Sequence, residues 1–594
     1  MDKNSAIGLT LIALLLLLYF YFFSPTPVPP DAKPVSKEIV IKGDSATLQR
    51  KSEVIDSITA TQYGNLSSFL TGTESFTTIE NDVLKLALSN HATFNEVNLK
   101  KYKTYSQQPL NLVKGGNNSF SLLAEYEGKK VDLYSLYYQP ETSKKGDTTF
   151  VSFTANLSES AYLKHIYSIP TTGYKIGYRI ESHGVSLNGK EVGFYWTDFI
   201  ALQEKDLKDS RNRTTVNYYS TTGSFDGLSE TSTDSKSVTD PLKWVAIKQK
   251  FFLSAIFAKD KFPAASLAIS VDDRDSSHVK KAEVNLSIPT DAIASNKANF
   301  SFYFGPNDYK ITKEVEEGFS RNMYLGWPPV IWVNKFLLMP VFNFLQTFIG
   351  NYGIIILLLV LFMKLLLMPL TYSSYMGMAK MRLLKPELDA IKEKNGDNMT
   401  QAQQDQMKLY QQAGVNPFAG CIPLLLQMPI IFSMFYLFPN SIDLRQQPFL
   451  WAEDLSTWDS IVTLPFSIPF GYGDHVSLFV LLMTASQIIF QWQNNQLQTV
   501  QGPMKAMGYV MPLIFLFMLN SFSAGLSFYY FASNLITFAQ QAIIKRFVDE
   551  NKIIAIMDEN RKKAASGTSK KSKFMSKLEG AMKASEEARK KSKK

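Results

Sequence analysis

The chain has very little of what enzymes and metalloproteins commonly use for chemistry. It has one cysteine, Cys421, among 594 residues, which excludes internal disulfide bonds and a cysteine-ligated metal cluster. No P-loop and no GxSxG motif is present. Five histidines show no metal-ligand spacing: His91, His165, His183, His278 and His475. We therefore predict no catalytic residue, no metal and no cofactor.

Long hydrophobic runs are missing from one part of the chain and abundant in another. Residues 31–325 are polar and rich in Ser, Thr, Asn and Asp, whereas residues 326–547 are dominated by Leu, Ile, Phe and Met. This predicts a large soluble domain joined to a membrane domain. An apolar run over 5–23 leads into a proline-rich segment without a small-residue cleavage site, so we predict an uncleaved anchor at 1–24 and a stiff linker after it.

Short alternating patterns mark residues 25–325 as β-structure. Apolar residues alternate with polar ones at Ile176, Tyr178 and Ile180, and again from Phe300 to Phe304. Turn-forming segments separate such stretches, which favours a large antiparallel β-sandwich. The segment 311–322 is expected to form a helix that closes the domain.

Apolar runs predict five further membrane spans, at roughly 351–372, 418–438, 475–492, 507–520 and 522–546, within a core at 350–547. With the anchor they make six. Residues 326–349 combine tryptophans with polar residues and Pro340. This favours an amphipathic helix lying in the membrane interface, with a plain spanning helix as the alternative.

Lysine and arginine distribution predicts the orientation. The segment 373–417 holds many of them, the segment 439–474 holds only Arg445, and the tail at 548–594 is strongly basic. By the positive-inside rule, both termini and 373–417 are cytoplasmic, and the β-domain lies outside the cytoplasm.

Two cytoplasmic parts are expected to meet partners. Residues 373–417 fit a helical hairpin with a turn at 395–398 and Gly414 as its C-cap. Its apolar stripe is too thin for a core of its own, so we expect it to dock on lipid or on a partner chain. The basic tail is expected to be solvated and to bind polyanions, either anionic lipid or RNA.

A single lysine interrupts the apolar run at 353–369. A charge inside a spanning helix costs about 2.5–3.5 kcal/mol on insertion scales, so such residues usually face a bundle interior or a wet cavity. Lys364 lies near the end of the run, and snorkelling to the headgroups is the alternative.

Uncharged polar side chains are scattered over the same spans. For any one of them, helix–helix hydrogen bonding is a sufficient explanation. Together with Lys364 they predict a polar cavity, open to the cytoplasm, that attracts acidic or polar peptide segments. The set comprises Thr371, Gln427, Thr484, Ser486, Gln487, Gln491, Tyr529, Tyr530, Ser533, Asn534, Thr537, Gln540 and Gln541.

Residues 351–546 closely resemble the YidC family of membrane-protein insertases. Several motifs stand in the family's order and spacing: Asn351-Tyr352-Gly353, Lys364, Met368-Pro369-Leu370-Thr371, Met378-Ala379-Lys380-Met381-Arg382, Pro386, Gly414-Val415-Asn416-Pro417, Gly420-Cys421-Ile422-Pro423-Leu424-Leu425-Leu426-Gln427-Met428-Pro429-Ile430, Leu444-Arg445-Gln446, Pro448-Phe449, Tyr529-Tyr530, Ser533-Asn534 and Gln540-Gln541. The β-rich region matches by its position and character.

The resemblance implies an insertase and chaperone of the bacterial inner membrane with a periplasmic β-sandwich. It further implies a groove open to cytoplasm and lipid, in which one positive residue attracts the client. That residue, usually arginine, matches Lys364, and a groove-lining polar position one turn earlier matches Val360. We assign the groove to Lys364, Thr371, Gln427, Gln487, Tyr530, Ser533 and Asn534.

The implied partners are nascent membrane proteins, the lipid bilayer and, through the hairpin and the tail, the ribosome. Sec-translocase partnership is left open, and no DNA binding is expected.

Two other functions compete with this interpretation. A small-solute transporter or channel would need internal repeats or broken helices at matching positions, and the sequence shows no repeat. An envelope enzyme acting on glycans through His165 and His183 would need a catalytic pair, which the β-domain lacks.

Overall fold

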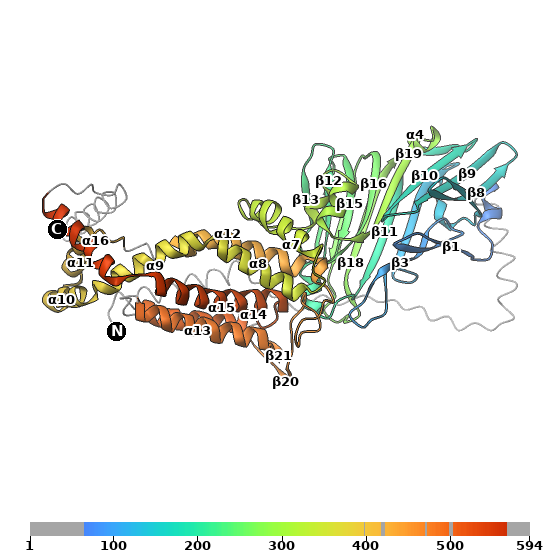
Figure 1. Cartoon of the computed structure of the whole chain (residues 1–594). Helices are drawn as coiled ribbons and strands as arrows, with labels where there is room; N and C mark the ends of the chain where they lie inside the picture. Colours follow the sequence, from blue (N-terminus) through green and yellow to red (C-terminus); the bar gives the residue numbers. More distant parts are fainter. Residues whose placement is uncertain (1–63, 397, 417–421, 470–471, 498–502, 567–594) are drawn as a thin grey trace, which may run out of the picture. The chain divides into compact units, whose positions relative to one another are not determined.

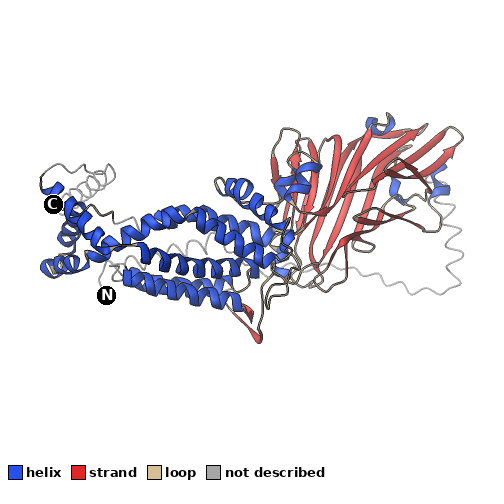
Figure 2. Ribbon diagram, viewed as in Figure 1, coloured by secondary structure: helices blue, strands red, loops and turns tan. Residues whose placement is uncertain are grey.

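A computed structural model describes residues 64–396, 398–416, 422–469, 472–497 and 503–566. The predicted anchor at 5–23, its linker and the end of the basic tail lie outside these residues. The chain divides into two compact units between Tyr324 and Leu325. The first consists mainly of strands and the second mainly of helices (Figure 2).

Two large antiparallel sheets dominate the first unit (Figure 1). The nine-stranded sheet has, in spatial order, β13 (Phe225–Gly227), β12 (Thr215–Ser220), β15 (Leu242–Lys248), β16 (Phe252–Phe262), β19 (Ala298–Pro306), β10 (Lys175–His183), β9 (Ala161–Pro170), β8 (Thr148–Ser158) and β7 (Gln139–Lys145). The six-stranded sheet has β14 (Asp234–Val238), β17 (Ala265–Ser270), β18 (His278–Pro289), β11 (Leu187–Ala201), β5 (Asn118–Tyr126) and β6 (Lys129–Asp132).

A smaller sheet and short helices complete this unit. The four-stranded sheet runs β1 (Phe76–Glu80), β2 (Leu84–Ser89), β3 (Phe94–Lys103) and β4 (Pro109–Lys114). The short helices are η1 (Gly64–Phe69), η2 (Leu133–Ser135), α3 (Leu207–Arg211), α4 (Thr290–Ala294), α5 (Tyr309–Val315) and η3 (Phe319–Asn322).

Aromatic side chains from the two large sheets meet in the core. Trp196 of β11 lies 6.2 Å from Phe304 of β19, and Phe194 lies 6.3 Å from Phe302, measured between ring centroids. These side chains point inward because strand residues alternate between the two faces of a sheet. The predicted β-sandwich is confirmed. The helix predicted over 311–322 is instead two short helices, because Gly318 between them takes a left-handed φ of 72°.

The second unit begins with a short helical stretch rich in exposed aromatic residues. It comprises α6 (Val330–Val333), the π-helical turn η4 (Asn334–Leu338) and α7 (Met339–Gln346). Trp332, Phe336, Phe344 and Phe348 are exposed, while Asn334 is buried and donates to the Leu325 carbonyl at 2.9 Å. One face is therefore apolar and uncovered by the described residues.

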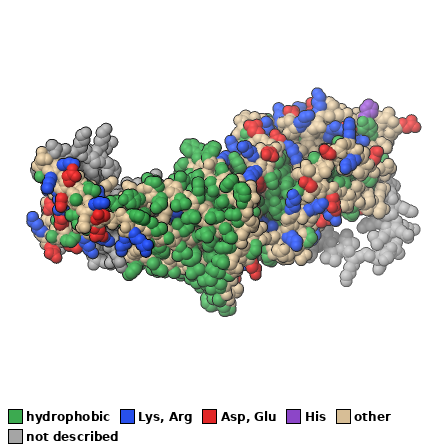
Figure 3. Space-filling model, viewed as in Figure 1, with side chains coloured by type: hydrophobic (Ala, Val, Ile, Leu, Met, Phe, Trp, Pro, Cys, Tyr) green, Lys and Arg blue, Asp and Glu red, His purple; other side chains and the backbone are tan. Residues whose placement is uncertain are grey.

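Six helices of the bundle follow in the described residues, connected by short helical turns, one hairpin of strands and the helical segment 385–413. The helices are α8 (Tyr352–Leu366), α9 (Met368–Leu383), α12 (Ile422–Leu437), α13 (Leu478–Leu497), α14 (Pro503–Leu519) and α15 (Ala524–Phe547). The turns are η5 (Phe438–Asn440) and η6 (Ile442–Leu444), and the strands are β20 (Val462–Ile468) and β21 (Gly473–Val476). Helix α15 packs against α8 and α13, α13 against α14, and α12 against α9. Figure 3 shows hydrophobic side chains over much of this unit's surface.

A sharp bend separates α8 from α9. The two helices meet at Leu367 at an angle of 60°, and Pro369 in the first turn of α9 has no N–H to continue the helix. Within the described residues, the α8–α9 pair has the length and composition of a broken membrane span, and no single helix does. The span predicted at roughly 351–372 therefore falls on a pair of helices that is bent.

A helical hairpin lies within the predicted range 373–417, but it spans only 385–413, because residues 373–383 belong to α9, and it has an additional partner. Helices α10 (Lys385–Asn395) and α11 (Met399–Ala413) form it, and Gly414 caps α11 with a φ of 63°, as predicted. Helix α16 (Glu550–Ala565), from the segment interpreted as a solvated tail, packs on them (Figure 1). Its Ile553 and Met557 share a buried cluster with Leu388 and Leu409.

Candidate functional site

Lys364 lies in the last turn of α8, which Asn351 caps at the other end by accepting from the Ile354 N–H at 3.1 Å. The Lys364 side chain is half-buried. No carboxylate of the described chain forms an ion pair with it. Its main-chain carbonyl accepts a 2.9 Å hydrogen bond from Nε2 of Gln540 on α15. The bundle therefore fixes the backbone at this lysine and leaves its charge uncompensated by any described acid.

The other predicted groove residues lie on four helices: Thr371 on α9, Gln427 on α12, Gln487 on α13, and Tyr530, Ser533 and Asn534 on α15. All six are half-buried.

Among the described residues, no side-chain hydrogen bond joins two of these predicted groove residues directly. Asn534 donates to the Ser486 hydroxyl at 2.8 Å, which ties α15 to α13. The Thr371 hydroxyl donates to the Leu367 carbonyl at 3.1 Å, one turn earlier on the chain. Gln427, Gln487 and Tyr530 make no side-chain hydrogen bond to any residue that the structure describes.

Three buried acceptors in this region have no hydrogen-bond partner among the described residues: Thr484 Oγ1, Gln540 Oε1 and Gln541 Oε1. Leaving such an atom unsatisfied costs about 1–3 kcal/mol, and each of these oxygens remains able to accept a hydrogen bond.

Gln540 and Gln541 belong to the polar set found in the sequence but were not assigned to the groove. Their spacing carries a signal. Residues seven apart share a helix face, and Gln540 stands seven after Ser533 just as Gln541 stands seven after Asn534.

The β-domain histidine considered for a glycan-acting site has a structural role. His165 is fully buried, and its two ring nitrogens lie 2.7 and 3.0 Å from the hydroxyls of Tyr178 and Tyr138. Burial lowers the pKa of His165 to about 3, so the ring stays neutral. A neutral ring held between two tyrosines offers no proton-transfer group to solvent.

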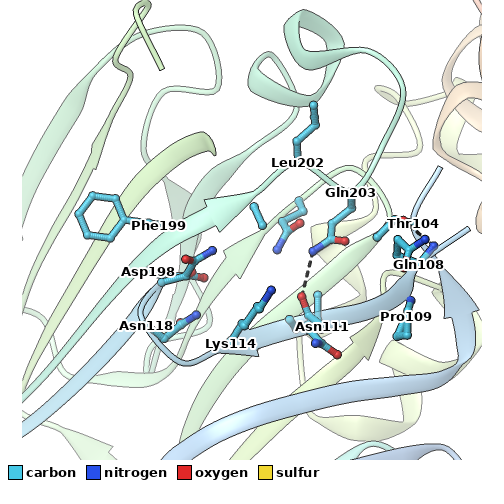
Figure 4. A pocket seen from close by; sticks show the side chains of 14 residues that line it. Thr104, Gln108, Pro109, Asn111, Lys114, Asn118, Asp198, Phe199, Leu202 and Gln203 are labelled. Atoms are coloured by element: carbon cyan, nitrogen blue, oxygen red, sulfur yellow. Dashed lines mark hydrogen bonds between the residues drawn. The ribbon is translucent and has the colours of Figure 1, made fainter. Parts of the chain in front are cut away.

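A cavity of about 180 Å³, lined by both polar and apolar groups, lies elsewhere in this domain, where β4, β5 and β11 approach one another (Figure 4). Gln203 Nε2 donates to the Asn111 carbonyl at 2.9 Å across it. Asp198 is buried, and its Oδ2 has no partner among the described residues. Burial raises the pKa of Asp198 to about 8. The lining contains no second carboxyl group and one cation, Lys114, so it holds no acid–base pair for glycan cleavage.

Both units match known family descriptions. Residues 77–340 match the YidC periplasmic domain, and residues 344–551 match the 60Kd inner membrane protein family.

Full-length relatives carry one name. A protein of Amoebophilus asiaticus named "Membrane protein insertase YidC" is 42% identical, with 98% of this chain and 99% of that protein covered. A protein of the same name from Cytophaga hutchinsonii is 42% identical over 99% of this chain and 98% of the relative. One from Parabacteroides distasonis is 36% identical over the same shares. A solved YidC insertase covers 84% of this chain and 99% of its own, at 18% identity and a TM-score of 0.32.

Proposed function

The chain belongs to the YidC family of membrane-protein insertases, and we propose that it passes the polar segments of its clients along a path between α8, α9, α12, α13 and α15. Family membership makes it an inner-membrane insertase and chaperone with a periplasmic domain, acting on nascent membrane proteins without enzymatic chemistry. The same membership decides against a transporter, a channel or a glycan-acting enzyme.

One observation carries the proposed path: an unpaired cation and unsatisfied acceptors share a helical interior. Lys364 has no acidic partner in the described chain. Thr484, Gln540 and Gln541 add buried oxygens that no described donor reaches. A polar client loop that crosses lipid loses hydration at every polar group. A wet path shortens the dry distance, after which the client helix moves into lipid and buries its apolar side chains there.

The remaining groove residues receive roles by their positions. Lys364 attracts the acidic or polar outer segment of a client. Tyr530 and Gln487 face it with uncommitted hydroxyl and amide groups, and Thr371, Gln427 and Ser533 add polar surface. Asn534 holds α15 against α13 through Ser486, so we assign it to positioning these groups.

The topology and the remaining partners belong to the same proposal. Six spans, counting the anchor at 5–23 and the bent α8–α9 pair, place both termini and the α10–α11 hairpin in the cytoplasm, as the lysine and arginine distribution favours. The α6–α7 stretch lies in the membrane interface, with Trp332 and Phe336 towards lipid. Ribosomes contact the cytoplasmic end, where the basic tail emerges.

Crosslinking tests the path directly. A photoreactive amino acid at position 530 of the full-length protein is expected to capture a stalled nascent membrane protein. The same probe at Leu535, which is 47% exposed on the same helix, serves as the lipid-facing control. Equal capture at both positions, or capture at 535 alone, would overturn the proposed path.

A further inference from the structure

The β20–β21 hairpin is anchored to the bundle by hydrogen bonds and exposes apolar side chains. It connects the segment after η6 to α13, and it projects from the bundle where α13 begins and α14 ends (Figure 1). The two strands pair antiparallel from Val462 opposite Val476 to Ile468 opposite Gly473.

Asp459 holds one side of the base. It accepts from the N–H groups of Leu478 and Phe479 at 2.9 and 3.1 Å and from the indole of Trp451 at 2.8 Å. The Ser477 hydroxyl also donates to it. A carboxylate at this position caps α13 and satisfies N–H groups that the first turn leaves free.

Asn520, just after α14, holds the second strand of the hairpin and the turn residue before it. Its amide donates to the carbonyls of Tyr472 and His475 at 2.8 and 2.7 Å, and its Oδ1 accepts from the Ser477 N–H at 3.1 Å. The His475 ring stacks on Trp458 at 3.7 Å between centroids. The hairpin is thus fixed to the ends of two helices at once.

Beyond this base the surface is apolar. Ile461, Val462 and Phe466 are 47%, 50% and 61% exposed, and the sequence has no charged residue between Asp459 and Asp474. An extramembrane loop in contact only with water has no reason to lack charge over such a length, and an exposed apolar surface of this kind marks an interaction site.

The apolar surface is continuous with the lipid-facing side of the bundle. Tyr472, at the end of the hairpin, packs on Phe517 of α14 at 5.4 Å between ring centroids. Phe517 and Met518 are themselves exposed, as are Val510 and Leu513 further along the helix. Aromatic side chains near the ends of membrane helices are typical of the headgroup region.

We propose that the β20–β21 hairpin inserts its apolar face into the headgroup–acyl boundary of the outer leaflet and thereby fixes the depth of α13, α14 and α15 in the bilayer. The choice of leaflet rests on the proposed orientation, whereas contact with lipid does not. A membrane surface fits better than a protein partner, because Ile461, Val462 and Phe466 are uncharged and continuous with the exposed apolar surface of α14, and the one acid of the hairpin, Asp474, stands on the other strand.

A spin-label experiment on the full-length protein tests the hairpin. Cys421→Ser removes the one native cysteine, and Phe466→Cys then carries a nitroxide in vesicles of phosphatidylethanolamine and phosphatidylglycerol. Glu453→Cys, a charged and exposed position just before the hairpin, is the matched control. We expect collisions with oxygen to exceed collisions with a water-soluble nickel chelate at 466, and the ratio to reverse at 453.

Each other result overturns the proposal. Dominant collisions with nickel at 466 would place the hairpin in water, and a label shielded from both reagents would mean that a second copy or another protein covers it. Val462→Cys, at another exposed apolar residue of the same strand, repeats the test if Phe466→Cys does not fold. No client is involved, so a failure to insert clients with an unchanged ratio counts against the proposed path alone.

Discussion

The side-chain amide of Gln540 donates a 2.9 Å hydrogen bond to the main-chain carbonyl of Lys364, a residue 176 positions earlier in the chain. Helix α15 thereby holds the backbone of α8 at the one charged residue of that helix. The contact uses the amide nitrogen of Gln540 and leaves its buried oxygen without a described partner. Gln540 therefore links the two helices through its nitrogen and places a polar oxygen between them.

Loss of this contact should weaken the bundle. We expect Gln540→Leu to lower the free energy of unfolding by roughly 0.5–1.5 kcal/mol, because it removes the hydrogen bond and leaves the Lys364 carbonyl without this donor. Gln541→Leu is the control, since it removes a buried oxygen that has no partner among the described residues and should be neutral or slightly stabilising. Thermal unfolding of the purified full-length variants measures both. Equal effects would show that the Gln540 contact contributes nothing specific.

The charge of Lys364 should matter for particular clients. Lys364→Ala is expected to reduce insertion of clients with acidic outer segments by about tenfold, the equivalent of ~1.4 kcal/mol, while Lys364→Arg, which keeps the charge, should be nearly silent. The measurement is client insertion in cells depleted of other insertases. Normal insertion of acidic clients by Lys364→Ala would remove the attraction role and leave the family assignment intact.

The β-domain should be dispensable for insertion. Every proposed groove residue lies after position 350, so deletion of residues 31–310 with retention of 311–349 should leave insertion largely intact. Further removal of 330–346, which forms α6, η4 and α7, should abolish it. Loss of insertion by the first deletion, in protein that is folded and integrated in the membrane, would move the active part out of the bundle.

Helix α16 and the residues after it should have separable roles. A chain ending at Ser566 keeps α16 on the hairpin, whereas one ending at Phe547 also removes the ion pairs Arg382–Glu550 and Arg561–Glu387. We expect ribosome binding in lipid-free detergent to fall in both and to be salt-dependent in the full chain. Only the shorter chain should show increased proteolysis in the hairpin. Full ribosome recovery by both truncations would restrict the basic tail to the membrane surface.

Asp198 should make the β-domain less stable in alkali. Burial raises its pKa in the folded protein to about 8, above the value of roughly 3.9 in an unfolded chain. The folded state therefore binds more protons between these values. Its extra stability is complete below about pH 4 and is lost as pH rises through 8.

Asp198→Asn removes this titration. The variant should gain roughly 1–3 kcal/mol relative to the parent between about pH 6 and pH 9. Tryptophan fluorescence during thermal unfolding across that range measures the difference, and Asp273→Asn, whose carboxylate is 94% exposed, is the control. Parallel curves for parent and Asp198→Asn would contradict the assignment.

Short sequence patterns correctly predicted those strands and helix ends that depend only on neighbouring residues. The alternation at Ile176, Tyr178 and Ile180 gave β10, because strand residues alternate in burial. The position of Gly414 gave the end of α11, because a left-handed cap favours glycine. The β-sandwich and the hairpin follow from such rules.

Long-range pairing could not be predicted in this way. The segment after Phe547 is rich in charged residues, so its sequence did not indicate that Ile553 and Met557, one helical turn apart, are buried. They pack against Leu388 and Leu409, which lie far earlier in the chain. The bend at Leu367 has a visible cause in Pro369, but its angle depends on packing. Within the candidate site, the sequence identified Lys364 and the polar residues of α15 individually, because they are polar residues in apolar segments. The contacts of Gln540 and Asn534 could not be predicted, because they depend on which helices pack against each other.

The bend between α8 and α9 also determines what surrounds the lysine electrostatically. A helix that ends inside a bundle presents its last carbonyl oxygens there, and together they carry about half a negative charge. Lys364 sits in that last turn, so the peptide dipoles of its own helix partly balance its ammonium group. In the proposed path, this balance allows the cation to remain without a resident carboxylate and leaves it available to each client in turn.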